Sequence, residues 1–187
     1  KEMVEKNKDV IYYLTLENQN YVHPPMPKNI EKKVLKGLYK VVDNKKASVQ
    51  LFGSGPLLTE ALAAAELLKK DWGVESSVWS VTSYSELRRE AEEVDRWNQN
   101  HPKENIKKSF LNNSLESVQT PIVAVTDYMK LVSEQIRPFI KNTYLTLGTD
   151  GFGRSETRSS LRKFFEIDEY YIVFSAIQGL VIDKKIE

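Results

Sequence analysis

The sequence predicts an α/β fold with three layers, αβα, around a mostly parallel five-stranded sheet that has one antiparallel edge strand. Three observations indicate it. From residue 49 onward, short runs rich in β-branched residues alternate with longer amphipathic runs. The run 121–126, PIVAVT, is almost wholly apolar, which is typical of a parallel strand covered on both faces. Glycine-bearing turns separate strand-like runs from helix-like runs, as in successive βαβ units.

Five runs are predicted as the strands of this sheet. The first two, 38–42 and 48–52, flank a short polar turn, which predicts a β-hairpin with 38–42 as the antiparallel edge strand. The other three each follow a helical run, and we expect them to be parallel: 77–82, 121–126 and 144–149. A further strand-like run at 10–16 precedes a proline-rich stretch and stands apart from the sheet.

Apolar residues at helical spacing predict the helices. The expected ranges are 28–36, 57–72, 85–100, 127–140 and 154–166, with a turn or two of helix near 107–116. We expect Leu58, Leu62, Ala65 and Leu68 to form the inward stripe of the second of these helices.

The apolar run 170–182 is compatible with two structures. Its β-branched residues favour a strand, whereas its length and a capping residue, Asp168, favour a helix. Tyr170, Phe174, Ile177 and Val181 also keep helical spacing, so we predict a helix.

Composition excludes several classes of function. The chain has 187 residues, of which 41% are hydrophobic, so it can bury a core, and its net charge of +1 gives no global basic field for nucleic acid. Because cysteine is absent, disulfides and thiolate metal sites are excluded, and a reducing, cytoplasmic location is expected. No apolar run reaches the ~20 residues that span a bilayer, so no membrane partner is expected. The polar ends predict a fragment of a longer chain.

Two glycine-bearing turns are candidate anion-binding or interface loops. In the first, Gly53, Ser54 and Gly55 precede Pro56 at a strand-to-helix junction, where backbone N–H groups can meet a phosphate. The dinucleotide fingerprint is incomplete, because Leu58 stands where its third glycine belongs. A tight packing turn is the simpler interpretation.

The second turn, GTDGFGRS, has the same position in its βα unit. Gly151 and Gly153 permit close approach of another backbone, and Arg154 or Ser155 could meet an anion. Alternatively, Asp150 accepts hydrogen bonds from free N–H groups and Phe152 plugs a neighbouring surface. No metal site is predicted.

The two histidines have different expected roles. His23 lies among prolines in a segment that leaves a strand, where an imidazole could act in acid–base chemistry. His101 follows a helix end, where its ring can satisfy the last carbonyls of that helix.

Several motifs together resemble the homodimeric type of pyruvate dehydrogenase. They are NQNYVHPPMP, VQLFGSGPLL, RWNQNHP, TDYMK and GTDGFGRS, and they occur in the family's order over nearly all of the chain. The resemblance implies a fragment with the end of a pyrimidine-binding domain and a linker at 1–27. A transketolase C-terminal-like domain would occupy 28–187.

The resemblance also implies an activity for the full-length parent. Members of this family decarboxylate pyruvate with thiamine diphosphate and magnesium, and pass the acetyl group to lipoyl groups of an acetyltransferase. The family's GDG…N motif, which holds the diphosphate and the metal, is absent here, so we expect no cofactor bound to this fragment and no activity from it alone. The resemblance makes His23 a tentative catalytic residue.

The expected task of this domain is dimer assembly and support of the active-site entrance in the parent. Two alternatives stay open. One is a free-standing α/β module that binds a phosphate, a nucleotide or a protein. The other is a domain of another thiamine enzyme, such as a transketolase.

Overall fold

The protein is described here by a computed structural model, which describes residues 1–11, 20–22 and 24–186. Its elements are, in chain order, α1 (Glu2–Glu5), α2 (Glu31–Lys36), β1 (Leu38–Val42), β2 (Val49–Gly53), α3 (Leu57–Trp72), β3 (Ser76–Val81), α4 (Tyr84–Asn100), α5 (Phe110–Ser114), β4 (Ile122–Val125), α6 (Lys130–Glu134), the 3-10 helix η1 (Arg137–Phe139), β5 (Tyr144–Leu147), α7 (Arg158–Phe164) and α8 (Glu169–Ile182). Among the described residues, no helix is both long and apolar enough to cross a membrane.

The five strands form one sheet in the order β1-β3-β2-β4-β5. The strands β2, β3, β4 and β5 are parallel, and β1 is antiparallel to β3. The predicted fold class is therefore confirmed. The central strand β2 is buried along its whole length, and the side chain of its polar residue Gln50 accepts a hydrogen bond from Trp79 Nε1 at 2.8 Å.

The predicted hairpin is wrong in its pairing. The strand at 38–42 is an antiparallel edge, as expected, but its neighbour is β3 and not β2. Both edges of β2 are taken by parallel strands, with Leu51 paired to Val78 on one side and to Val123 on the other. Because β2 has no free edge, β1 pairs at the outer edge of β3.

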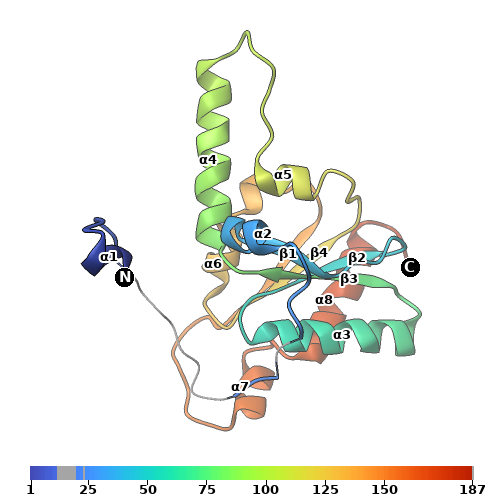
Figure 1. The fold of residues 1–187 in the computed structure, drawn as a ribbon. Helices are drawn as coiled ribbons and strands as arrows, with labels where there is room; N and C mark the ends of the chain where they lie inside the picture. The colour runs from blue at the N-terminus through green and yellow to red at the C-terminus, as the bar shows by residue number, and fades with distance from the viewer. Residues whose placement is uncertain (12–19, 23, 187) are drawn as a thin grey trace.

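Two apolar cores lie on opposite faces of the sheet, which confirms the three-layer arrangement. One core joins α3 and α8 to the sheet through Leu68, Ala176 and Val123. The other joins α4 and α5 through Leu87 and Leu111 to the opposite face. The second half of α4 extends beyond the sheet, and the chain returns toward α5 through the loop that follows it (Figure 1).

The helix predicted at 170–182 is confirmed, since α8 begins after Asp168, whose side chain accepts from the backbone N–H groups of Tyr170 and Tyr171. The residues that gave the helical spacing are not the ones that face the core. Ile172, Ala176 and Leu180 are buried, whereas Tyr170, Phe174 and Val181 are exposed. The helix is apolar on all sides, so spacing alone did not identify its inward face.

Other departures are smaller. The inward stripe of α3 is formed by Leu58, Ala61, Ala64 and Leu68, while the expected Leu62 and Ala65 are only partly buried. The helix predicted over 127–140 divides into α6 and η1, and α6 begins after Met129 rather than at Asp127. The strand expected at 10–16 lies largely outside the described residues.

Candidate functional site

The candidate site is the edge of the sheet where the parallel strands end. The loops that follow β2, β4 and β5 meet there because the carboxyl ends of parallel strands share one edge. The ladder continues past the strand ends, with Ser54 N donating to the Val125 carbonyl at 3.1 Å and Thr126 N donating to the Leu147 carbonyl at 3.1 Å. Sequence reasoning placed both glycine turns at this edge, and the structure brings them together there.

The first glycine turn is closely packed. A Cβ atom added at Gly53 would lie 2.6 Å from the Leu58 Cα, so the glycine lets α3 approach β2. Gly55 has a φ of +57°. The N–H groups of Leu57 and Leu58 donate to the carbonyls of Ser54 and Gly55 at 3.2 Å. These bonds engage two of the donors at the helix start that an anion would use, which favours the packing role of this turn.

The second glycine turn is joined to the loop after β4. Thr149 N donates to the Tyr128 carbonyl at 2.9 Å, and Thr149 Oγ1 donates to the Asp127 carbonyl at 2.6 Å. The Asp150 carboxylate accepts from Lys130 N at 2.9 Å. Asp150 thus accepts a backbone N–H, as one of the two interpretations expected, but the donor belongs to the start of α6.

Beyond Asp150 the second turn is open. A Cβ atom at Gly151 or at Gly153 would meet nothing within 4 Å, and Phe152 between them is 92% exposed. The Arg154 guanidinium lies 5.1 Å from the centre of the Phe164 ring. These contacts do not test the anion or interface role of Arg154 and Ser155, which stays a prediction.

A cavity of about 310 Å³ lies beside the two turns. Its walls come from the start of α3, from Asp127 and Thr149, and from α7 and the segments that flank it. The apolar part of the lining is Pro56, Leu57, Leu161, Phe165 and Ile167, and the polar part adds Glu156, Arg158 and Arg162. A cavity with this lining can hold a small group of a partner molecule or a neighbouring side chain.

An ion pair beside this cavity connects α3 with α7. Arg162 Nη1 donates to Glu60 Oε1 at 2.6 Å, and the two side chains are 17% and 13% exposed. Burial raises the pKa of Glu60 to about 7, and a hydrogen bond with Glu169 adds to the rise, while Arg162 opposes it. Sequence reasoning missed this pair, because its members are 102 positions apart and no local pattern joins them.

The two histidines are placed differently. His23, the tentative catalytic residue, lies outside the described residues. His101 fulfils its predicted role, because its Nδ1 lies 2.7 Å from the Trp97 carbonyl at the end of α4. Its ring also stacks on Trp97 with centroids 4.3 Å apart.

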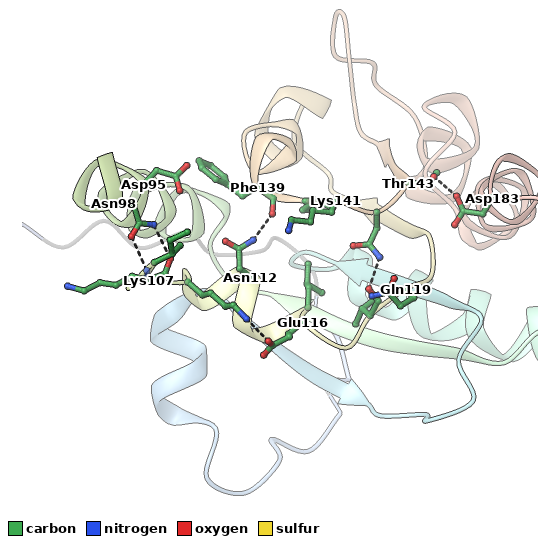
Figure 2. Close-up of a pocket in the computed structure, with 16 residues that line it drawn as sticks. Asp95, Asn98, Lys107, Asn112, Glu116, Gln119, Phe139, Lys141, Thr143 and Asp183 are labelled. Carbon is green, nitrogen blue, oxygen red and sulfur yellow. Dashed lines mark hydrogen bonds and ion pairs between the residues drawn. The ribbon is translucent and has the colours of Figure 1, made fainter. Parts of the chain in front are cut away.

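A larger groove, of about 630 Å³, lies away from this edge, between the end of α4, α5 and the segment before β5 (Figure 2). Its polar side chains mostly bond to one another or to nearby backbone. Asn98 pairs with the backbone of Lys107 at 2.9 and 3.0 Å, and the Asn112 amide donates to the Phe139 carbonyl at 2.8 Å (Figure 2). These bonds hold the loops of the groove together.

The described residues offer no cluster for the metal that the resemblance implies for the parent. Within residues 1–11, 20–22 and 24–186, no group of three His, Cys, Asp or Glu side chains could hold a metal ion. The GDG…N motif is absent from the sequence. No reaction step is therefore assigned to this chain through a bound cofactor.

Known proteins resemble this chain in sequence and in fold. The chain is 50% identical over 182 residues to the pyruvate dehydrogenase E1 component of Cupriavidus necator, covering 95% of this chain and 20% of that protein. It is 45% identical over 191 residues to the protein of the same name from Pseudomonas aeruginosa, covering 100% of this chain and 22% of that protein. The chain thus spans about a fifth of the length of the curated relatives it matches.

Among solved structures, a transketolase of Pichia stipitis has the same fold, with a TM-score of 0.57 and 18% identity over 83% of this chain and 20% of that chain. The resemblance to pyruvate dehydrogenase is confirmed by the two relatives, and the likeness to transketolase is weaker in sequence. Residues 37–168 match the family described as the transketolase-like TK C-terminal domain. The chain belongs to this family of transketolase-like C-terminal domains.

Proposed function

We propose that this chain is the C-terminal domain of a pyruvate dehydrogenase E1 component. The observation that carries the proposal is the 50% identity over 182 residues to the Cupriavidus necator protein of that name. The motifs RWNQNHP, TDYMK and GTDGFGRS support it, because they occur together and in order. The transketolase alternative has less support, since an identity of 18% indicates the fold alone.

In this proposal the parent decarboxylates pyruvate with thiamine diphosphate and magnesium and transfers the acetyl group to lipoyl groups of an acetyltransferase. The parent is a cytoplasmic homodimer, and both cofactors bind to its upstream part. Residues 1–27 end the pyrimidine-binding domain and form a linker, and 28–187 form the C-terminal domain. This domain contributes to assembly and supports the active-site entrance with the loops at the carboxyl edge of its sheet.

The test compares three proteins: the full-length parent, the parent without residues 28–187, and the chain alone. Pyruvate-dependent CO₂ release and acetylation of a lipoyl domain are measured for each with thiamine diphosphate and magnesium added. We expect turnover from the full-length parent and none from this chain above the rate of free cofactor. CO₂ release by this chain alone, or a full-length parent that acts on sugar phosphates and not on pyruvate, would contradict the proposal.

We also propose that His23 acts in the active site of the parent. The support comes from the sequence, because prolines on its C-terminal side restrict the backbone that carries it. In the full-length parent, His23→Ala should lower pyruvate turnover by about 10²–10⁴-fold and leave melting unchanged.

The matched control for this experiment is His101→Ala. It removes the ring that stacks on Trp97 at the end of α4, so it should lower melting and leave turnover nearly intact. A His23→Ala parent whose turnover stays within about threefold of the unmutated enzyme would remove His23 from the site.

A further inference from the structure

Exposed apolar side chains gather on the two joined loops at the carboxyl edge of the sheet. Tyr128, Met129 and Leu131 come from the loop after β4 and the start of α6, and Phe152 comes from the loop after β5. We call these four side chains the paired-loop face. A cluster of large apolar side chains in water is unfavourable for an isolated domain and is characteristic of an interaction surface.

The base of this face is held in place by the backbone. Thr149 bonds to the carbonyls of Tyr128 and Asp127, and Asp150 accepts from Lys130 N. Gly148 is required for this approach, because a Cβ atom there would lie 2.7 Å from the Tyr128 carbonyl oxygen. A surface whose backbone is already ordered loses less conformational entropy when a partner binds.

The tip of the face has no packing partner among the described residues. Phe152 is 92% exposed, and the glycines on both sides of it have no atom within 4 Å of an added Cβ. An aromatic side chain between two unhindered glycines can enter a pocket on another surface without steric conflict from its neighbours. Buried aromatic side chains of this kind supply much of the binding energy of protein interfaces.

The chain that precedes the domain passes close to the same edge. The Arg158 guanidinium of α7 lies 5.4 Å from the centre of the Tyr21 ring, so the segment before α2 runs beside α7 (Figure 1). In the proposed parent, where this chain is the C-terminal domain and about a fifth of the length, the preceding domain connects to this one through the segment that carries Tyr21. The upstream part of the parent is therefore tethered near the paired-loop face.

We infer that the paired-loop face docks onto the preceding domain of the same polypeptide, with Phe152 inserted into that domain. The inference rests on the proposed function only in that the chain is the terminal part of a longer parent. It assigns a specific task to the loops at the carboxyl edge: Asp150 and Thr149 position the face, and Phe152 with Met129 makes the contact.

The test is photo-crosslinking in the full-length parent. Benzoylphenylalanine replaces Phe152 in one variant and Trp72 in the control. Trp72 is also a large exposed aromatic, at 60%, but it ends α3 and so lies at the opposite edge of the sheet. An equal mixture of ¹⁴N- and ¹⁵N-labelled parent, assembled together, distinguishes crosslinks within one polypeptide from those between copies.

We expect the probe at position 152 to crosslink within its own polypeptide to residues that precede Lys1, with a yield several-fold above that of the probe at position 72. Three results would overturn the inference: crosslinks confined to this domain, crosslinks to a second copy or another protein, or equal yields at both positions. The readout needs no substrate, so it is independent of the pyruvate turnover that tests the proposed function.

A second measurement uses melting. Phe152→Asp should lower the melting temperature of the full-length parent or separate its melting into two transitions, and leave the melting of this chain alone unchanged. Ile106→Asp, at another exposed apolar position, is the control and should change neither. If Phe152→Asp destabilises the isolated chain as much as the parent, Phe152 supports its own domain and the docking inference is wrong.

Discussion

The two glycine turns of this domain occupy the same position in their βα units and use glycine for opposite reasons. At the first turn, Gly53 allows close contact, because a Cβ atom would lie 2.6 Å from the Leu58 Cα and 3.2 Å from the Ala61 Cβ. At the second, Gly151 and Gly153 face open space. The first turn fixes α3 against the sheet, whereas the second turn holds Phe152 away from the sheet.

The difference shows why a glycine pattern alone does not identify a site. Both turns precede a helix, and both contain two glycines separated by one residue. What separates them is the element that follows. The helix α3 has 16 residues and is buried against β2, whereas α7 has seven residues and none of them is fully buried. The first turn has to pack closely, and the second has room to serve an interface.

The largest expected effect is at the packed turn. Gly53→Ala should lower the free energy of unfolding by about 3 kcal/mol, because the new methyl group meets backbone atoms of α3 and the helix has to move. Urea unfolding of this chain, followed by circular dichroism, measures the change.

Gly73→Ala is the matched control. Gly73 has a φ of +64° but nothing within 4 Å of an added Cβ, so its substitution should cost only the strain of a left-handed residue, about 1 kcal/mol. Equal losses at positions 53 and 73 would show that the close contact at Gly53 costs no more than the strain of a left-handed residue, and the packing role of the first turn would be wrong.

The ion pair that joins the helices after the two turns predicts a pH dependence. The pKa of Glu60 is raised from 4.5 to about 7, so between these values the folded chain holds a proton that the unfolded chain releases. The contribution of Glu60 to stability is therefore largest below pH 4.5 and is lost as the pH rises through about 7.

Glu60→Gln should remove this part of the pH dependence, with a change on the order of 1 kcal/mol between pH 5 and pH 8. Urea unfolding at several pH values measures it. Glu66→Gln, at an exposed glutamate on the same helix, is the control for the change of charge. An unchanged slope in the Glu60→Gln chain would show that Glu60 titrates as an ordinary surface carboxylate.

Sequence patterns predicted the sheet well because its strands are short, apolar and separated by clear turn residues. Leu51, Val81, Val123 and Val125 are buried on these strands. Leu147 is only partly buried, at the end of the edge strand β5. Edge position depends on strand order, which no single strand's sequence encodes.

Other features of the fold also depend on tertiary packing. The strand β1 pairs with β3 because β2 has no free edge. The helix α8 is apolar on all sides, so its inward face is determined by the sheet against which it packs. The Glu60–Arg162 pair depends on how α7 packs against α3. The loop residues were identified, but only the fold shows that Asp150 joins its loop to Lys130.

The smallest expected effects are at the open turn, and they test whether it is open in solution. Gly151 has a φ of +88°, so Gly151→Ala should cost about 1 kcal/mol of backbone strain with no steric contact to add to it.

Gly153 has neither a left-handed backbone nor a neighbour within 4 Å. Gly153→Ala should therefore be neutral or stabilising by about 0.5 kcal/mol, because alanine reduces the entropy of the unfolded chain. Both values come from urea unfolding of this chain. A loss at position 153 as large as the one at Gly53→Ala would show that the second turn is packed like the first, and the contrast between the two turns would fail.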